Sequence, residues 1–161
     1  MNKNIFIAFK EAEHFEVNLV GGKGAGLIRS TLAGLPVPDG YVIPTSVYSA
    51  WFTPLKAEIE TALLGIKQPQ EKSQKIREIL QEKPLPDDLI KALDELEKKF
   101  PETYFAVRSS GSAEDLPGAA FAGLHDTILN VKGVAALERA IKQCWLSLWN
   151  PEVIVYREKL A

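Results

Sequence analysis

Two short segments of the chain each place one basic side chain among glycine, alanine and serine. The first, VGGKGAGL, carries Lys23 at the expected start of a helix. In the second, VRSSGSAEDLPG, Arg108 ends an apolar run and precedes Ser109 and Ser110, whose hydroxyls add hydrogen-bond donors. Small residues leave backbone N–H groups open to approach, and ammonium and guanidinium groups bind phosphate oxygens. Together the two segments favour a polyphosphate ligand.

Each segment also has a simpler interpretation. Lys23 would be a surface side chain on a glycine turn, and Arg108 would pair with Glu114 or Asp115 to close its own loop. The known phosphate-binding patterns do not decide between these readings. G-x-x-x-x-G-K-[ST] fails because a glycine follows the lysine, and G-x-G-x-x-G fails because its last position is a leucine.

Composition limits the classes of function. The 161 residues are 46% hydrophobic, enough for one domain with a substantial core. A net charge of −2 excludes a global basic field for nucleic acid or anionic membrane, so an anion site must be local. Cys144 is the single cysteine, and no apolar run reaches membrane-spanning length. From the short apolar run near the N-terminus we expect no signal peptide. We expect a cytoplasmic protein.

The elements that must position these side chains follow from periodicity. Strands are expected at residues 4–9, 41–43, 104–108 and 127–131, and helices at 22–33, from 45 or 46 with Thr45 or Ser46 as cap, from 134, and from 151. Residues 53–102 keep helical spacing throughout, with Asp87 as a helix cap, and predict a helical layer without chemistry. Trp145 and Trp149, four residues apart, are expected to pack in the core. The fold class is α+β.

Four motifs in order resemble a known family. VGGKGAGL, GLPVPDGYVIPTSVY, VRSSGSAEDLPGAAFAGLHDTILNV and SLWNPEVIVYR are similar to the N-terminal nucleotide-binding domain of phosphoenolpyruvate synthase, pyruvate phosphate dikinase and rifampicin phosphotransferase. The resemblance implies an ATP-grasp type fold in which this chain supplies one wall of the ATP cleft. It also implies phosphate contacts from Lys23, Arg108, Gly123 and Thr127, with magnesium held by ligands outside residues 1–161.

The resemblance predicts a dikinase segment that passes ATP phosphate through a phosphohistidine to pyruvate or a related acceptor. Residues 1–161 are then one incomplete N-terminal portion, inactive alone and prone to self-association, whose partners are ATP and downstream domains. Leu124-His125 and Asn150-Pro151-Glu152 depart from the pattern, so the branch stays open. The alternatives are a rifampicin-phosphotransferase-like segment and a non-catalytic binding remnant. For His125, a local hydrogen bond, a ligand contact and a catalytic role all remain open.

Overall fold

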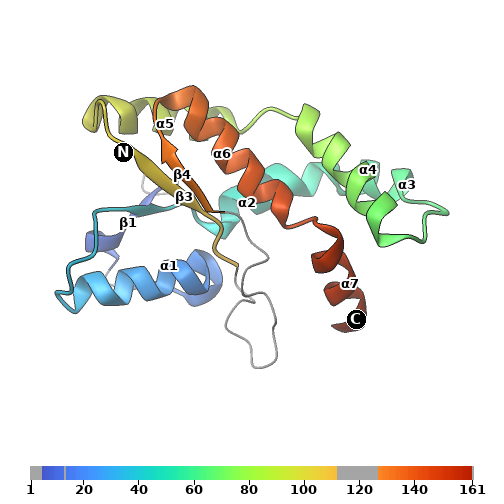
Figure 1. Ribbon diagram of the computed structural model, residues 1–161, viewed down its shortest axis with the longest axis horizontal. Helices are drawn as coiled ribbons and strands as arrows, with labels where there is room; N and C mark the ends of the chain where they lie inside the picture. Colours follow the sequence, from blue (N-terminus) through green and yellow to red (C-terminus); the bar gives the residue numbers. More distant parts are fainter. Residues whose placement is uncertain (1–4, 13, 112–126, 161) are drawn as a thin grey trace.

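Helices dominate the molecule. The computed structural model describes residues 5–12, 14–111 and 127–160 (Figure 1). Within them the strands form two antiparallel sheets of two strands each, which is the predicted α+β class. In chain order the elements are β1 (Ile7–Ala8), the 3₁₀ turn η1 (Phe9–Glu11), α1 (Val17–Leu32), β2 (Tyr41–Val42), α2 (Thr45–Phe52), the 3₁₀ turn η2 (Thr53–Leu55), α3 (Lys56–Ala62), α4 (Pro69–Glu82), α5 (Asp87–Lys99), β3 (Phe105–Arg108), β4 (Thr127–Val131), α6 (Val134–Ser147) and α7 (Pro151–Leu160).

The first sheet is shorter than predicted. β1 pairs with β2 only through Ile7 opposite Val42 and Ala8 opposite Tyr41. The expected strand at 4–9 is too long at both ends, because β1 begins only at Ile7 and Phe9 already begins η1. The Phe9 N–H donates to the Gly40 carbonyl at 3.0 Å, and its ring lies so close that a Cβ on Gly40 would come within 2.6 Å of Cζ. Burying this ring turns the chain out of the strand.

Helix α1 and the first sheet enclose a small core of their own. This N-terminal core consists of the buried side chains Phe9, Ala12, Val20, Ala25, Ile28 and Val42. α1 begins at Val17, earlier than predicted, but Gly21 interrupts it with φ 73° and ψ 169°. Its second part, from Gly22, therefore coincides with the predicted start. The predicted stop is confirmed by Gly34, whose φ of 76° is a left-handed conformation that favours glycine.

Helices α3, α4 and α5 form the predicted helical layer. In α5 the buried side chains Leu89, Ala92, Leu93 and Leu96 recur at three- and four-residue spacing. The predicted caps are wrong, because Pro44 and Pro86 occupy the N-cap positions and neither helix has a side-chain cap bond. The Thr45 hydroxyl donates instead to the Asn18 carbonyl at 2.9 Å and so joins α2 to α1.

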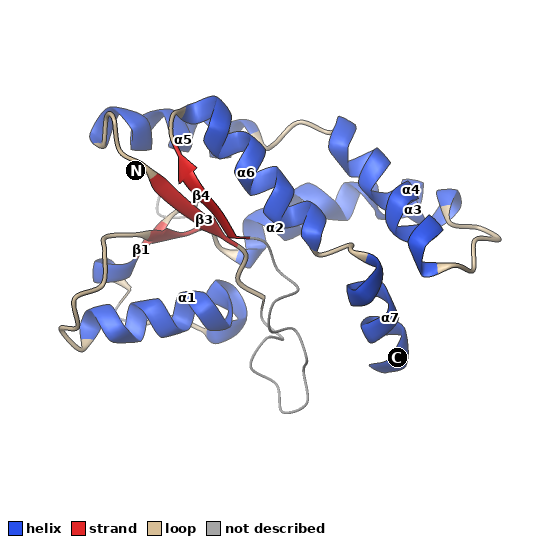
Figure 2. Ribbon diagram, in the orientation of Figure 1, coloured by secondary structure: helices blue, strands red, loops and turns tan. Residues whose placement is uncertain are grey.

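The second sheet lies against α6. In Figure 2, α6 runs alongside β3 and β4. Phe105 is opposite Val131 and Arg108 is opposite Thr127, with an irregularity between Phe105 and Val107. α6 contributes to the main core, which consists of Ile5, Phe6, Val47, Trp51, Ile59, Ile76, Leu80, Leu85, Leu89, Ala92, Leu93, Leu96, Val131, Leu137, Ala140, Ile141, Trp145, Leu146 and Ile154.

The tryptophans pack as predicted. Trp145 is a buried member of the main core, and Trp149 is partly buried against it. Trp149 Nε1 donates to the Tyr48 hydroxyl at 2.9 Å, which ties α2 to the connection between α6 and α7. In the described part of the chain, no helix has both the length and the apolar composition to cross a bilayer.

Candidate functional site

The fold brings the two cation-bearing segments together. Lys23 Nζ donates to the backbone carbonyl of Ser109 at 3.2 Å, although the residues are 86 positions apart. Lys23 lies in the first turn of the second part of α1, and Ser109 follows the last residue of β3. This junction, residues 20–24 against 108–111, is the candidate site.

Glycine makes the close approach possible. At Gly21 an added Cβ would lie 2.7 Å from the Ser110 carbonyl carbon and would overlap its oxygens. The Gly22 N–H donates to the Gly111 carbonyl at 3.1 Å, and the Gly24 N–H donates to Ser110 Oγ at 2.9 Å. The sequence suggested that N–H groups at this helix start would be open to a phosphate. These two instead bind the neighbouring strand end.

Arg108 is the exposed last residue of β3. Within the described residues its guanidinium makes no hydrogen bond or ion pair. The alternative partners Glu114 and Asp115 lie outside the described residues, as do Gly123 and His125. The phosphate-clamp and loop-tie interpretations of Arg108 both remain predictions.

The two serines after Arg108 differ in their contacts. Ser109 is buried at 8% exposure, and its Oγ has no hydrogen-bond partner among the described residues. An unpaired buried hydroxyl is unfavourable by about 1–3 kcal/mol. Ser109 Oγ is therefore a better candidate than Ser110 Oγ to donate a hydrogen bond to a ligand oxygen. Ser110 Oγ is already engaged on both sides, since it accepts from Gly24 N–H and donates to the Val20 carbonyl at 3.0 Å.

The junction lines a large cavity. Its volume is about 1070 Å³, slightly above the range of roughly 300–1000 Å³ common for small-molecule sites. Lys23, Gly24, Arg108 and Ser109 belong to the lining, whereas Thr127, which pairs with Arg108 across the sheet, does not. The predicted site residues therefore gather at one place, except that Thr127 lies outside the cavity lining and Gly123 outside the described residues.

The lining combines apolar surface with positive charge. Its described charged residues are Lys23, Arg108 and Arg157 against Asp39, and Asp39 is paired with Lys10 at 2.5 Å. A chain with a net charge of −2 thus concentrates cations here, as a local anion site requires. Arg157 lies over the Trp149 ring at 4.8 Å, and burial lowers the pKa of its guanidinium. Sequence reasoning missed Arg157, because only packing brings α7 to this cavity.

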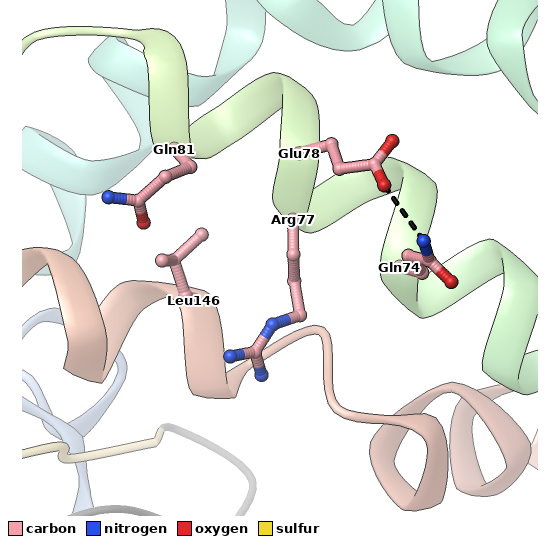
Figure 3. Close-up of a pocket in the computed structure, with 5 residues that line it drawn as sticks. All are labelled: Gln74, Arg77, Glu78, Gln81 and Leu146. Carbon is pink, nitrogen blue, oxygen red and sulfur yellow. Dashed lines mark hydrogen bonds between the residues drawn. The ribbon is translucent and has the colours of Figure 1, made fainter.

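A second, smaller hollow is a weaker candidate. It has a volume of about 290 Å³ and is lined by Gln74, Arg77, Glu78, Gln81 and Leu146 (Figure 3). Three of its polar side chains already have hydrogen-bond partners. Gln74 donates to Glu78 at 2.9 Å, and Arg77 donates to the Asn150 side chain.

Comparison with known proteins assigns the family. Residues 17–161 match the model of the pyruvate phosphate dikinase AMP/ATP-binding domain. The chain belongs to this family. Its relatives include rifampicin phosphotransferase of Bacillus subtilis, 36% identical over 96% of this chain, and a probable phosphoenolpyruvate synthase of Methanocaldococcus jannaschii, 38% identical over 96%. Phosphoenolpyruvate synthase of Aeropyrum pernix is 35% identical over 99% of the chain.

These family members are much longer proteins. The chain spans 19% of the Bacillus subtilis relative, 14% of the Methanocaldococcus jannaschii relative and 21% of the Aeropyrum pernix relative. The match covers the whole junction, since residues 20–24 and 108–111 both lie inside 17–161.

Proposed function

We propose that the chain binds ATP at the junction, with the phosphates held by Lys23, Arg108 and the hydroxyl of Ser109. The observation that carries this proposal is the Lys23 ammonium at 3.2 Å from the Ser109 carbonyl, in the lining of the large cavity. Two cations and an unpaired buried donor suit the charge on polyphosphate oxygens. Thr127 and Gly123 belong to the same proposal through the family resemblance.

The chain would then serve as the nucleotide-binding part of a phosphoenolpyruvate-synthase-like dikinase in the cytoplasm. Such an enzyme transfers ATP phosphate through a phosphohistidine to pyruvate or a related acceptor, and residues 1–161 would form one wall of an ATP-grasp type cleft. Lys23 and Arg108 would stabilise the charge that spreads over phosphoryl oxygens during transfer. A rifampicin-phosphotransferase-like segment is the second candidate, supported by 36% identity to the Bacillus subtilis enzyme.

Magnesium accompanies ATP in phosphoryl transfer, where it neutralises charge on the β- and γ-phosphates. Among residues 5–12, 14–111 and 127–160, no group of three or more His, Cys, Asp or Glu side chains is placed to hold a metal ion. We place the ligands of the magnesium outside residues 1–161. In the proposal these residues act on phosphate oxygens only.

Titration with ATP tests the proposal. Replacing Lys23 by Met removes the ammonium, and the loss of one charge-assisted contact should weaken ATP binding by about tenfold or more, measured by phosphorus NMR of the nucleotide. Lys67→Met is the matched control, because Lys67 is exposed, lies outside the cavity lining and loses the same charge. Equal affinity of wild type and Lys23→Met would overturn the proposal. We expect no ATP turnover by the chain alone.

A further inference from the structure

We propose that Ser110 is a positioning residue, whose hydroxyl locks the Lys23 turn onto the end of β3 and so sets Lys23 against Ser109 and Arg108. This inference rests on the proposed ATP site and deepens it. Ser110 would not contact the nucleotide. It would act through Lys23, by fixing the point from which the lysine side chain extends.

The hydroxyl of Ser110 makes two hydrogen bonds, and both join it to the backbone beside Lys23. It donates to the Val20 carbonyl at 3.0 Å and accepts from the Gly24 N–H at 2.9 Å. Val20 precedes Lys23 by three positions and Gly24 follows it directly, so the two bonds bracket the lysine. A hydroxyl that donates and accepts in this way has no donor left for a phosphate. This assigns Ser110 a different role from the donor that its sequence suggested.

Backbone contacts add to the two bonds of Ser110, and we call all of these contacts, between residues 20–24 and 110–111, the clasp. The Gly22 N–H donates to the Gly111 carbonyl at 3.1 Å, and Gly21 lies against the Ser110 carbonyl with no room for a Cβ. Residues on both sides of Lys23 are therefore bound to residues 110–111. The clasp joins the first turn of the second part of α1 to a strand end that is distant in sequence, and no hydrogen bond of a regular helix or sheet contributes to it.

Fixing the backbone matters because lysine is a long, flexible side chain. A lysine loses up to about 2 kcal/mol of rotamer entropy when it is immobilised, which corresponds to roughly thirtyfold in affinity. When the backbone of Lys23 is already fixed, less conformational entropy remains to be lost on binding a phosphate. The 3.2 Å contact of Lys23 Nζ with the Ser109 carbonyl shows the side chain already directed toward the proposed phosphate position. Without Ser110, the turn would be held to the strand end by fewer contacts.

Amide hydrogen exchange tests the clasp without any ligand. In Ser110→Ala, the Gly24 N–H loses its acceptor, and we expect its exchange to accelerate about three- to tenfold while the core amides of α5 keep their rates. Thr31→Ala is the matched control, because the Thr31 hydroxyl donates at 2.8 Å to the Leu27 carbonyl within the same helix. That control should leave Gly24 unchanged. Unchanged Gly24 exchange in Ser110→Ala would overturn the inference.

A double-mutant cycle tests whether Ser110 acts through Lys23. Ser110→Ala should weaken ATP binding about three- to tenfold in the wild-type background and less than about twofold in the Lys23→Met background. Equal losses in both backgrounds, or a lower melting temperature with unchanged ATP affinity, would overturn the positioning role. If Lys23→Met alone does not weaken ATP binding, the proposed function fails and this inference with it. If Lys23→Met weakens binding and Ser110→Ala does not, only the inference fails.

Discussion

At the scale of single residues, the site depends on positions where a side chain would be in the way. Gly21 has a φ of 73° and lies against Ser110, so both its conformation and its surroundings require glycine. Gly24 has more room for a side chain than Gly21, because the nearest atom to an added Cβ would be Val42 Cγ2 at 3.2 Å. Gly26, in the same helix, has nothing within 4 Å of an added Cβ. The three glycines therefore differ in how strictly the structure requires them.

We expect Gly21→Ala to destabilise the chain by about 2 kcal/mol or more, because it adds left-handed strain to an overlap with the Ser110 backbone. The measurement is urea unfolding followed by circular dichroism. Gly26→Ala is the control from the same helix, and it should raise stability by about 0.5–1 kcal/mol, as alanine does in an open helical position. Similar effects of the two substitutions would contradict the structural difference between them.

Arg108→Lys separates the two interpretations of Arg108. If the arginine clamps phosphate, the lysine keeps the charge but loses the planar fork, so ATP affinity should fall about tenfold or more with little change in melting temperature. We expect this result. If Arg108 instead ties down Glu114 or Asp115, melting temperature should fall and ATP affinity should persist. Thermal melting and ATP titration of the same variant decide between them.

At the scale of elements, an aromatic cluster joins α2 to the end of α6. Tyr48 stacks on Phe52 with ring centroids 5.5 Å apart and meets Trp145 edge-on at 5.4 Å. Its hydroxyl accepts the Trp149 Nε1 hydrogen at 2.9 Å. Burial raises the pKa of Tyr48 above its ordinary value of 10.0, with smaller opposing effects of Trp149 and Arg157. The cluster supports α7, which carries Arg157 into the cavity lining.

Tyr48→Phe should therefore lower stability in a pH-dependent way. At about pH 8 we expect a loss of about 1 kcal/mol, because Trp149 Nε1 loses its acceptor. The raised pKa means that the folded state resists ionisation of Tyr48. The contribution of the Tyr48 hydroxyl to the free energy of unfolding is thus fully present below about pH 10. It declines as the pH rises toward the folded-state pKa. The gap between wild type and variant should narrow above about pH 10, measured by urea unfolding. A constant gap would contradict the burial effect.

At the scale of the whole molecule, two cores of unequal size are joined at the junction. Among the described residues, the N-terminal core has six buried members, whereas the main core has nineteen. Figure 1 shows α1 and β1 on one side of β3 and β4, away from α3 and α4. The clasp and the Thr45–Asn18 hydrogen bond connect the smaller part to the larger one. A smaller buried apolar surface gives a lower free energy of local opening.

Native-state hydrogen exchange should reveal this difference. We expect the amides of α1 to open with a lower free energy than those of α5, whose inner face belongs to the main core. Gly21→Ala should lower the opening energy of α1 further and leave α5 close to the wild-type value at low denaturant. Equal opening energies in α1 and α5 would instead indicate a single cooperative unit.

Local pattern alone determined most of the elements and identified two of the three described cationic residues that line the cavity. Three- and four-residue spacing of apolar side chains predicted α5, and glycine and proline predicted the stop after α1 and the start of α7, because these signals depend only on nearby backbone. Lys23 and Arg108 were identified from residue type and small neighbours in the same way.

Only the tertiary structure decided how these parts meet. The break at Gly21, the engaged hydroxyl of Ser110 and the arrival of Arg157 at the cavity all depend on contacts between segments far apart in the chain. The Thr45 hydroxyl, expected to cap its own helix, donates to the Asn18 carbonyl of another helix, and Pro44 is the N-cap residue. A short sequence pattern does not show which distant backbone group will become the hydrogen-bond partner of a hydroxyl or an N–H. The packing of the two cores determines that partner.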